Sequence, residues 1–161
     1  MTYNQLQIAE ALQINRVYVA RLIKSGKIKG QKQGRAYKVT RANLEKFLGR
    51  KFPQKFYTLQ EIALLLKLHR TFVSKLIRQK SLKTVQIGRF YRIAETDLKN
   101  LIKTEIPKKV FSIAELAQIT HTARSNLVRA IIANHLKAIK LLTEYRISQK
   151  QAEEYFHISP D

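Results

Sequence analysis

The chain repeats one pattern three times at a fixed spacing of 54 residues. Tyr3, Tyr57 and Phe111 open the three copies, and the sequences that follow align without a gap. A repeat of this length is typical of one small supersecondary unit used several times. We therefore predict three modules, over residues 1–49, 56–103 and 110–157, joined by short linkers.

The chain of 161 residues carries a formal net charge of +20. A surface this basic favours a polyanion as partner, with DNA or RNA first and an anionic membrane second. The charge is uneven, because residues 1–48 hold ten Lys or Arg against two Glu, residues 56–102 nine against three acids, and residues 110–156 six against four. The third copy has therefore lost most of the electrostatic attraction to phosphate groups.

Several classes of protein are disfavoured by the residues present. The chain has no cysteine, which excludes a disulfide framework, a thiolate zinc site and a cysteine nucleophile. No apolar run approaches the length of a membrane span, and the N-terminus has no signal-peptide pattern. His69, His121, His135 and His157 lack the spacing of metal ligands, and no catalytic set can be assembled. We expect a cytoplasmic, nucleoid-associated protein that is not an enzyme and needs no cofactor, metal or membrane.

Each copy begins with the signals of a short helix, a tight turn and a second helix. Asn4, Thr58 and Ser112 are N-cap residues, and each is followed three positions later by Gln or Glu, which is the spacing of a capping box. Asn15 is a second cap, and the apolar residues after it recur at the spacing of one buried helical face. The opposite face is basic, so the pattern predicts a helix-turn-helix.

A hairpin follows in copies 1 and 2, and a third helix closes each of the three copies. Apolar and polar residues alternate around Gly34-Arg35 and around Gly88-Arg89, and we expect each glycine to adopt a positive φ. Apolar residues at helical spacing then predict a helix that packs back on the first two. The predicted fold class is mainly α with small β-hairpin wings, arranged as three tandem winged helix-turn-helix domains.

Copy 2 resembles the excisionase-type winged helix-turn-helix domain, a relative of the MerR DNA-binding domain. The resemblance rests on YTLQEIALLLKLHRTFVSKLIRQK, the turn IGRFYRI and the helix DLKNLI, and copy 1 is similar through IAEALQINRVYVARLIKSGKIK and GRAYKV. The resemblance implies DNA binding, with the second helix in the major groove and the wing on an adjacent backbone or minor groove. It also implies a role as an excisionase or as a transcription regulator of a phage, plasmid or other mobile element.

The candidate DNA-binding residues lie on the outer face of each second helix and on the wings. A helix that enters the major groove needs donors near its N-terminus, where Arg16 and Arg70 can reach a guanine edge or a phosphate. Tyr18 is interpreted as the edge of the core, with base stacking as the alternative. The full set is Arg16, Tyr18, Arg21, Lys24, Lys32, Arg35, Lys38, Arg70, Thr71, Ser74, Lys75, Arg78, Arg89, Arg92, Arg124, Asn126 and Arg129.

Copy 3 departs from this pattern where contact with DNA is expected. Leu142-Thr143 replaces the glycine-arginine turn, and Ile132 replaces the basic residue near the end of the second helix. Asn126 still offers an amide that can read adenine. Two hypotheses follow, a weak third DNA reader or a surface for self-association or for another protein, and the added apolar residues favour the second.

The linkers are short and basic, and about seven extended residues reach roughly 25 Å. Adjacent groove sites on one face of DNA lie about 34 Å apart. Copies 1 and 2 are therefore expected to read double-stranded DNA at two elements about one helical turn apart. Two alternatives stay open at this point: a protein–protein adaptor, and a binder of RNA or of any nucleic acid without sequence preference.

Overall fold

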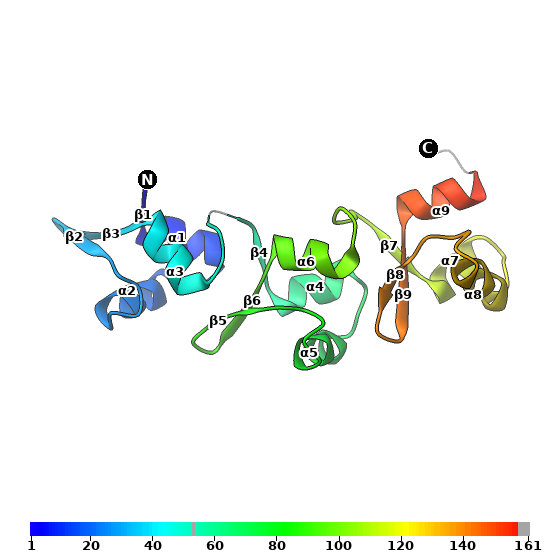
Figure 1. Ribbon diagram of the computed structural model, residues 1–161, viewed down its shortest axis with the longest axis horizontal. Coiled ribbons are helices and arrows are strands. Elements are labelled where there is room, and N and C mark those ends of the chain that lie inside the picture. Colours follow the sequence, from blue (N-terminus) through cyan, green and yellow to red (C-terminus); the bar gives the residue numbers. More distant parts are fainter. Residues whose placement is uncertain (53, 158–161) are drawn as a thin grey trace. The chain divides into compact units, whose positions relative to one another are not determined.

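The computed structural model describes residues 1–52 and 54–157. The described chain is mainly helical with small antiparallel sheets, and each copy contains two consecutive short helices in contact, followed by a hairpin and a third helix (Figure 1). Two compact units are present, Met1–Thr58 with Lys83–Glu95, and Leu59–Leu82 with the chain from Thr96 onward. Their boundaries cut through copy 2, because its hairpin belongs to the unit of copy 1 and its first two helices to the unit of copy 3.

The first unit contains all of copy 1 and the strands of copy 2. Its elements are β1 (Thr2–Asn4), α1 (Gln5–Leu12), α2 (Arg16–Lys24), β2 (Gln31–Gln33), β3 (Ala36–Thr40), α3 (Arg41–Leu48), β4 (Phe56–Tyr57), β5 (Val85–Ile87) and β6 (Phe90–Ala94). The strands form two antiparallel sheets, ordered β1-β3-β2 and β4-β6-β5. We call β2–β3 the first hairpin and β5–β6 the second hairpin. The first hairpin extends away from α1 and α3 (Figure 1).

The helices of copy 1 begin where the local signals predict. Asn4 Oδ1 accepts a hydrogen bond from Gln7 N, and Gln7 Oε1 accepts one from Asn4 N, both at 2.9 Å, which confirms the capping box. Asn15 Oδ1 accepts from Val17 N at 2.7 Å and caps α2. Each cap satisfies an N–H that has no partner within the helix.

The core of the first unit combines residues of two copies. Val85, Ile87 and Ala94 from the second hairpin lie in the same buried cluster as the apolar faces of α1 and α2. Phe52 and Phe56 belong to that cluster too, each with 1% of its surface exposed. Burial of these two rings ties both ends of the first linker to the core of the first unit.

The second unit contains the helices of copy 2 and all of copy 3. Its elements are α4 (Leu59–Leu65), α5 (Arg70–Arg78), α6 (Glu95–Ile102, whose first residue belongs to the first unit), β7 (Val110–Ser112), α7 (Ile113–Ile119), α8 (Arg124–Ile132), β8 (Ile139–Leu141), β9 (Glu144–Ser148) and α9 (Gln149–Phe156). The strands form one antiparallel sheet ordered β7-β9-β8, in which β8–β9 is the third hairpin. Ser112 and Glu115 form the expected capping box of α7. Leu116, Leu127 and Ile147 centre a buried cluster of copy 3.

The tip of each hairpin is a two-residue turn whose first residue has a positive φ. Gly34 and Gly88 both have φ +61°, as predicted. Leu142 takes the same place in copy 3 with φ +54°, a backbone conformation that residues with a Cβ rarely adopt. The repeat therefore conserves the turn even where its glycine is lost.

Each sheet has a third strand that the sequence pattern did not predict. Tyr3 and Phe111 were expected only as residues that precede a helix, yet they pair with Val39 and Ile147 on the hairpin strands β3 and β9. The opening aromatic residue thereby joins the start of the first helix to the hairpin.

Two properties of the described part bear on the function. None of its helices combines the length and the hydropathy that a membrane crossing requires. Within residues 1–52 and 54–157, the His, Asp and Glu side chains nowhere gather in a group that would hold a metal ion.

Candidate nucleic-acid interface

Helix α2 turns one face to the core and the other to solvent. Val19 and Leu22 are buried, whereas Arg16, Arg21 and Lys24 are exposed. Arg16 is the first residue of the helix, where free backbone N–H groups and the helix dipole already favour a phosphate. The outer face therefore offers cations along its whole length.

Helix α5 repeats this arrangement in copy 2. Arg70, Thr71, Lys75 and Arg78 are exposed. Ser74 is half-buried, and its Oγ donates a hydrogen bond to the Arg70 carbonyl at 3.2 Å. The Ser74 hydroxyl proton is thus engaged within the helix, so Ser74 is the weakest of the predicted contacts on α5.

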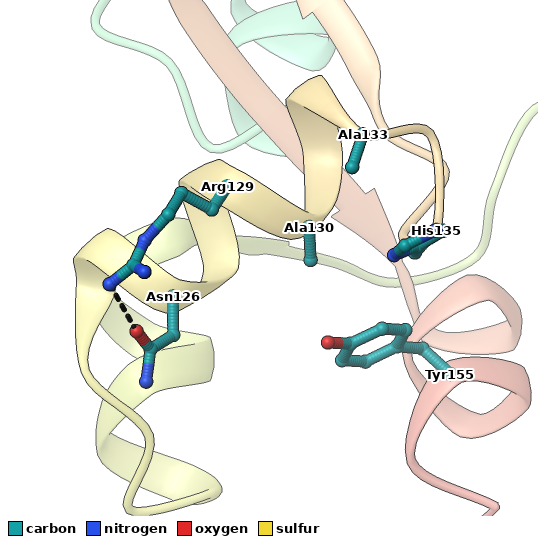
Figure 2. A pocket seen from close by; sticks show the side chains of 6 residues that line it. All are labelled: Asn126, Arg129, Ala130, Ala133, His135 and Tyr155. Carbon is teal, nitrogen blue, oxygen red and sulfur yellow. Dashed lines mark hydrogen bonds between the residues drawn. The ribbon is translucent and has the colours of Figure 1, made fainter.

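Helix α8 carries the corresponding residues of copy 3. Arg124, Asn126 and Arg129 are exposed. Arg129 Nη2 donates to Asn126 Oδ1 at 2.9 Å (Figure 2). This bond uses the amide oxygen and leaves the amide NH₂ as a donor toward a base or a phosphate.

A shallow hollow of about 260 Å³ lies beside α8. Its lining includes Ala130, His135 and Tyr155, with Asn126 and Arg129 on the α8 side (Figure 2). Ala130 lines this hollow and stands where copies 1 and 2 have leucine, so copy 3 has a smaller side chain at this position.

The first hairpin carries the basic residues expected of a wing. Lys32 and Arg35 are exposed, and Lys38 is half-buried. The loop between α2 and β2 adds Lys27 and Lys29, both exposed, which the sequence analysis did not include. Their position between Gly26 and Gly30, directly after the basic helix, was the available signal.

The prediction that Arg92 contacts DNA is wrong. This side chain is buried, with 6% of the residue exposed, and its Nε donates to the Leu12 carbonyl at 2.7 Å. Its Nη2 donates to the Gln13 carbonyl at 2.5 Å. The guanidinium group thus serves the turn between α1 and α2, because a buried and bonded cation cannot reach a phosphate.

Tyr18 is likewise engaged inside the first unit. Its ring meets the Phe90 ring edge to face, with centroids 5.5 Å apart, and a Cβ at Gly88 would overlap the Tyr18 hydroxyl. These contacts agree with the interpretation of Tyr18 as the edge of the core. Arg89 stays exposed at the same turn, with its guanidinium 5.2 Å from the Phe90 ring centroid.

Acidic residues are absent from a long segment of each copy that includes the whole second helix and the hairpin tip. In each copy, a Glu of the first helix is followed by a segment without Asp or Glu that runs at least to the end of the hairpin turn. The acids that flank these segments are Glu10 and Glu45, Glu61 and Glu95, and Glu115 and Glu144. Two basic positions recur on all three second helices and are exposed in each: Arg16, Arg70 and Arg124, and Arg21, Lys75 and Arg129.

Two of the acids are engaged in internal pairing. The backbone N–H of Phe52, and after it the Arg41 guanidinium, lowers the pKa of Glu45. A hydrogen bond from the Lys67 ammonium lowers the pKa of Glu115, which makes an ion pair with it at 2.7 Å. These carboxylates therefore bind groups elsewhere in the fold and do not neutralise the exposed cations of α2, α5 and α8.

Comparison with known proteins agrees with this geometry. A family model described as a helix-turn-helix domain matches residues 6–51 and again residues 56–105, which together are more than half of the chain. No curated protein and no solved structure matches the chain. The two matched segments contain α1–α2 and α4–α5 with their exposed basic faces. The chain therefore belongs to the helix-turn-helix domain family, a family of DNA-binding modules.

Proposed function

We propose that the protein binds specific sites in double-stranded DNA, with α2 and α5 as the main reading helices. It would act as an accessory factor of site-specific recombination or as a regulator of transcription on a mobile element. The observation that carries the proposal is the recurrence of exposed basic residues at two fixed positions of α2, α5 and α8. Such recurrence on outward faces is what repeated contact with a regular polyanion requires.

The first hairpin is proposed to hold the DNA backbone. Lys32 and Arg35 are exposed on it, and the segment that leads to it from α2 contains no acid. Side chains that grip phosphates set the register of the protein, whereas donors on the reading helix select the bases. Arg16 and Arg70, in the first turns of α2 and α5, are the best-placed candidates for selection.

Two readers on one chain strengthen each other. Once one helix is bound, the second meets its element at a high effective concentration, so two weak contacts give one tight complex. We propose two elements about 10 base pairs apart, read by α2 and α5, with copy 3 serving self-association or a protein partner. The protein would then regulate by occupying or bending the site.

The decisive variants reverse the charge on the reading helices. Arg16→Glu with Arg70→Glu should abolish binding to a DNA site selected from a random pool, because each lost arginine contact costs about 1–3 kcal/mol. The matched control is Lys46→Glu with Lys150→Glu, which makes the same charge change on α3 and α9. Gel-shift titration measures both.

Each outcome separates the candidate functions. Equal losses in both variants would mean that bulk charge alone drives binding. Equal affinity of the wild type for single strands and unrelated duplexes would favour the non-specific binder. Absence of any DNA complex, together with a protein complex that survives the charge reversal, would favour the adaptor.

A further inference from the structure

We propose that Arg92 and Arg146 are positioning residues for DNA recognition, each acting on the copy that precedes its own. Arg92, in copy 2, would position α2 of copy 1, and Arg146, in copy 3, would position α5 of copy 2. This inference rests on the proposed function of α2 and α5 as reading helices.

Arg92 binds the turn that leads into α2. Its Nε and Nη2 donate to the carbonyls of Leu12 and Gln13, which are the last residue of α1 and the left-handed residue after it, with φ +51°. The last carbonyls of a helix lack partners within it, and a cation there also favours the helix dipole. Because α2 begins at Arg16, only three residues after Gln13, a fixed turn fixes the start of α2.

Arg146 makes the same bonds in the second unit. Its Nε donates to the Leu66 carbonyl at 2.8 Å, and its Nη2 donates to the Lys67 carbonyl at 2.9 Å. Lys67 has φ +48°, like Gln13, and α5 begins three residues later at Arg70. The same two donor atoms thus reach the same two acceptors one repeat further along.

The two guanidinium groups keep this geometry with different neighbours. Arg92 lies 5.4 Å from the Phe90 ring centroid, a cation–π arrangement. Arg146 Nη1 instead pairs with Glu144 Oε2 at 3.0 Å, and Glu144 occupies the repeat position of Phe90. The two arginines therefore share their hydrogen bonds to the turn. The neighbour that holds the guanidinium group differs, an aromatic ring in copy 2 and a carboxylate in copy 3.

The first hairpin lacks this connecting surface. Lys38 stands at the repeat position of Arg92, and Gln31 and Gln33 are exposed where Val85 and Ile87 are buried. The first hairpin is thereby left to contact DNA, whereas the second and third hairpins brace the copy before them.

Copy 3 fills the corresponding place with a side chain of its own. The Thr120 carbonyl, at the repeat position of the Leu12 carbonyl, accepts a hydrogen bond from Thr122 Oγ1 at 3.2 Å. Copies 1 and 2 have Ile14 and Leu68 at the position of Thr122, and neither offers a donor. The start of α8 is thus set without an arginine from another copy.

The test is a footprint of the full-length protein on a selected site with two elements. Arg16→Ala and Arg70→Ala first assign each element to α2 or α5. Arg92→Gln should then weaken protection of the α2 element about 2- to 30-fold, the range expected for a residue that acts through a neighbour. Arg146→Gln should do the same to the α5 element. Arg92→Lys, which keeps the charge but lacks the planar fork, should behave like Arg92→Gln.

Protection of the other element is the internal control for folding. The footprints are taken with protein in excess over the affinity of a single reading helix, so that the tether does not couple the two elements. Unfolded protein would then lower the protection of both elements equally, and equal loss, loss only at the other element, or no loss would each overturn the proposal. Hydrogen exchange of the amides at the start of α2 gives a readout without DNA, and Arg92→Gln should speed it relative to α8. If Arg92→Gln speeds exchange at the start of α2 but the wild-type protein protects no DNA, the proposed function is refuted and the positioning of α2 by Arg92 still stands.

Discussion

Removing the two exposed cations of the first hairpin should change the salt dependence of DNA binding by a calculable amount. Each phosphate contact contributes about 0.9 to the slope of log K against log salt, so Lys32→Gln with Arg35→Gln should lower the slope by about 1.8. Between about 50 and about 200 mM salt, the wild type should then lose about twelvefold more affinity than the variant. Neither side chain has a charged partner among the ion pairs of the described residues.

The assay is fluorescence anisotropy with one labelled duplex at several salt concentrations. Lys46→Gln with Lys150→Gln is the control, because it removes the same charge from α3 and α9. The control should keep the wild-type slope to within about 0.3, a third of one phosphate contact. An unchanged slope in the hairpin variant, or an equal drop in the control, would refute the assignment of the first hairpin to the DNA backbone.

Three further predictions concern stability, each read by chemical or thermal unfolding. Gly34→Ala should lower the free energy of unfolding by about 1 kcal/mol through its positive φ alone. Gly88→Ala should lower it more, because the added methyl group also meets the tyrosine hydroxyl of α2. Equal losses of stability would contradict that contact. Ala123→Asn should stabilise the chain by about 1 kcal/mol, since α8 has no side-chain cap; no gain would mean that the cap geometry is not available there. The Lys67 ammonium, followed by a backbone N–H, lowers the pKa of Glu115, so its stabilising contribution is present above the ordinary value of 4.5 and is lost as the pH falls through the lower folded value. Glu115→Gln should therefore flatten the loss of stability on acidification, and an unchanged acid profile would argue against the pair.

The parts of the fold that depend on neighbouring residues could be predicted from the sequence. Asn4 and Asn15 cap helices because their side chains reach N–H groups two or three residues away. Gly34 and Gly88 mark the hairpin turns because the chain needs a positive φ there. Each signal is complete within a few residues, and the three copies repeat most of them.

Contacts between copies could not be predicted in this way. Arg92 looks like a wing cation in its own copy, and only the position of Leu12, eighty residues earlier, shows that it is a connector. A signal was present in the repeat, since the second and third hairpins are apolar where the first has Gln31 and Gln33. The strand that contains Tyr3 was missed for a similar reason, because its partner Val39 lies across the module.

The most direct test of tandem reading is a hydroxyl-radical footprint of the wild-type protein on the duplex that it selects from a random pool. Tandem reading by α2 and α5 should protect two elements on one face of the DNA, about 10 base pairs apart. With protein in excess over the affinity of a single reading helix, Arg16→Ala should remove one of them and Arg70→Ala the other. Protection of a single element, or the loss of both elements with either variant, would contradict the claim that α2 and α5 read separate sites.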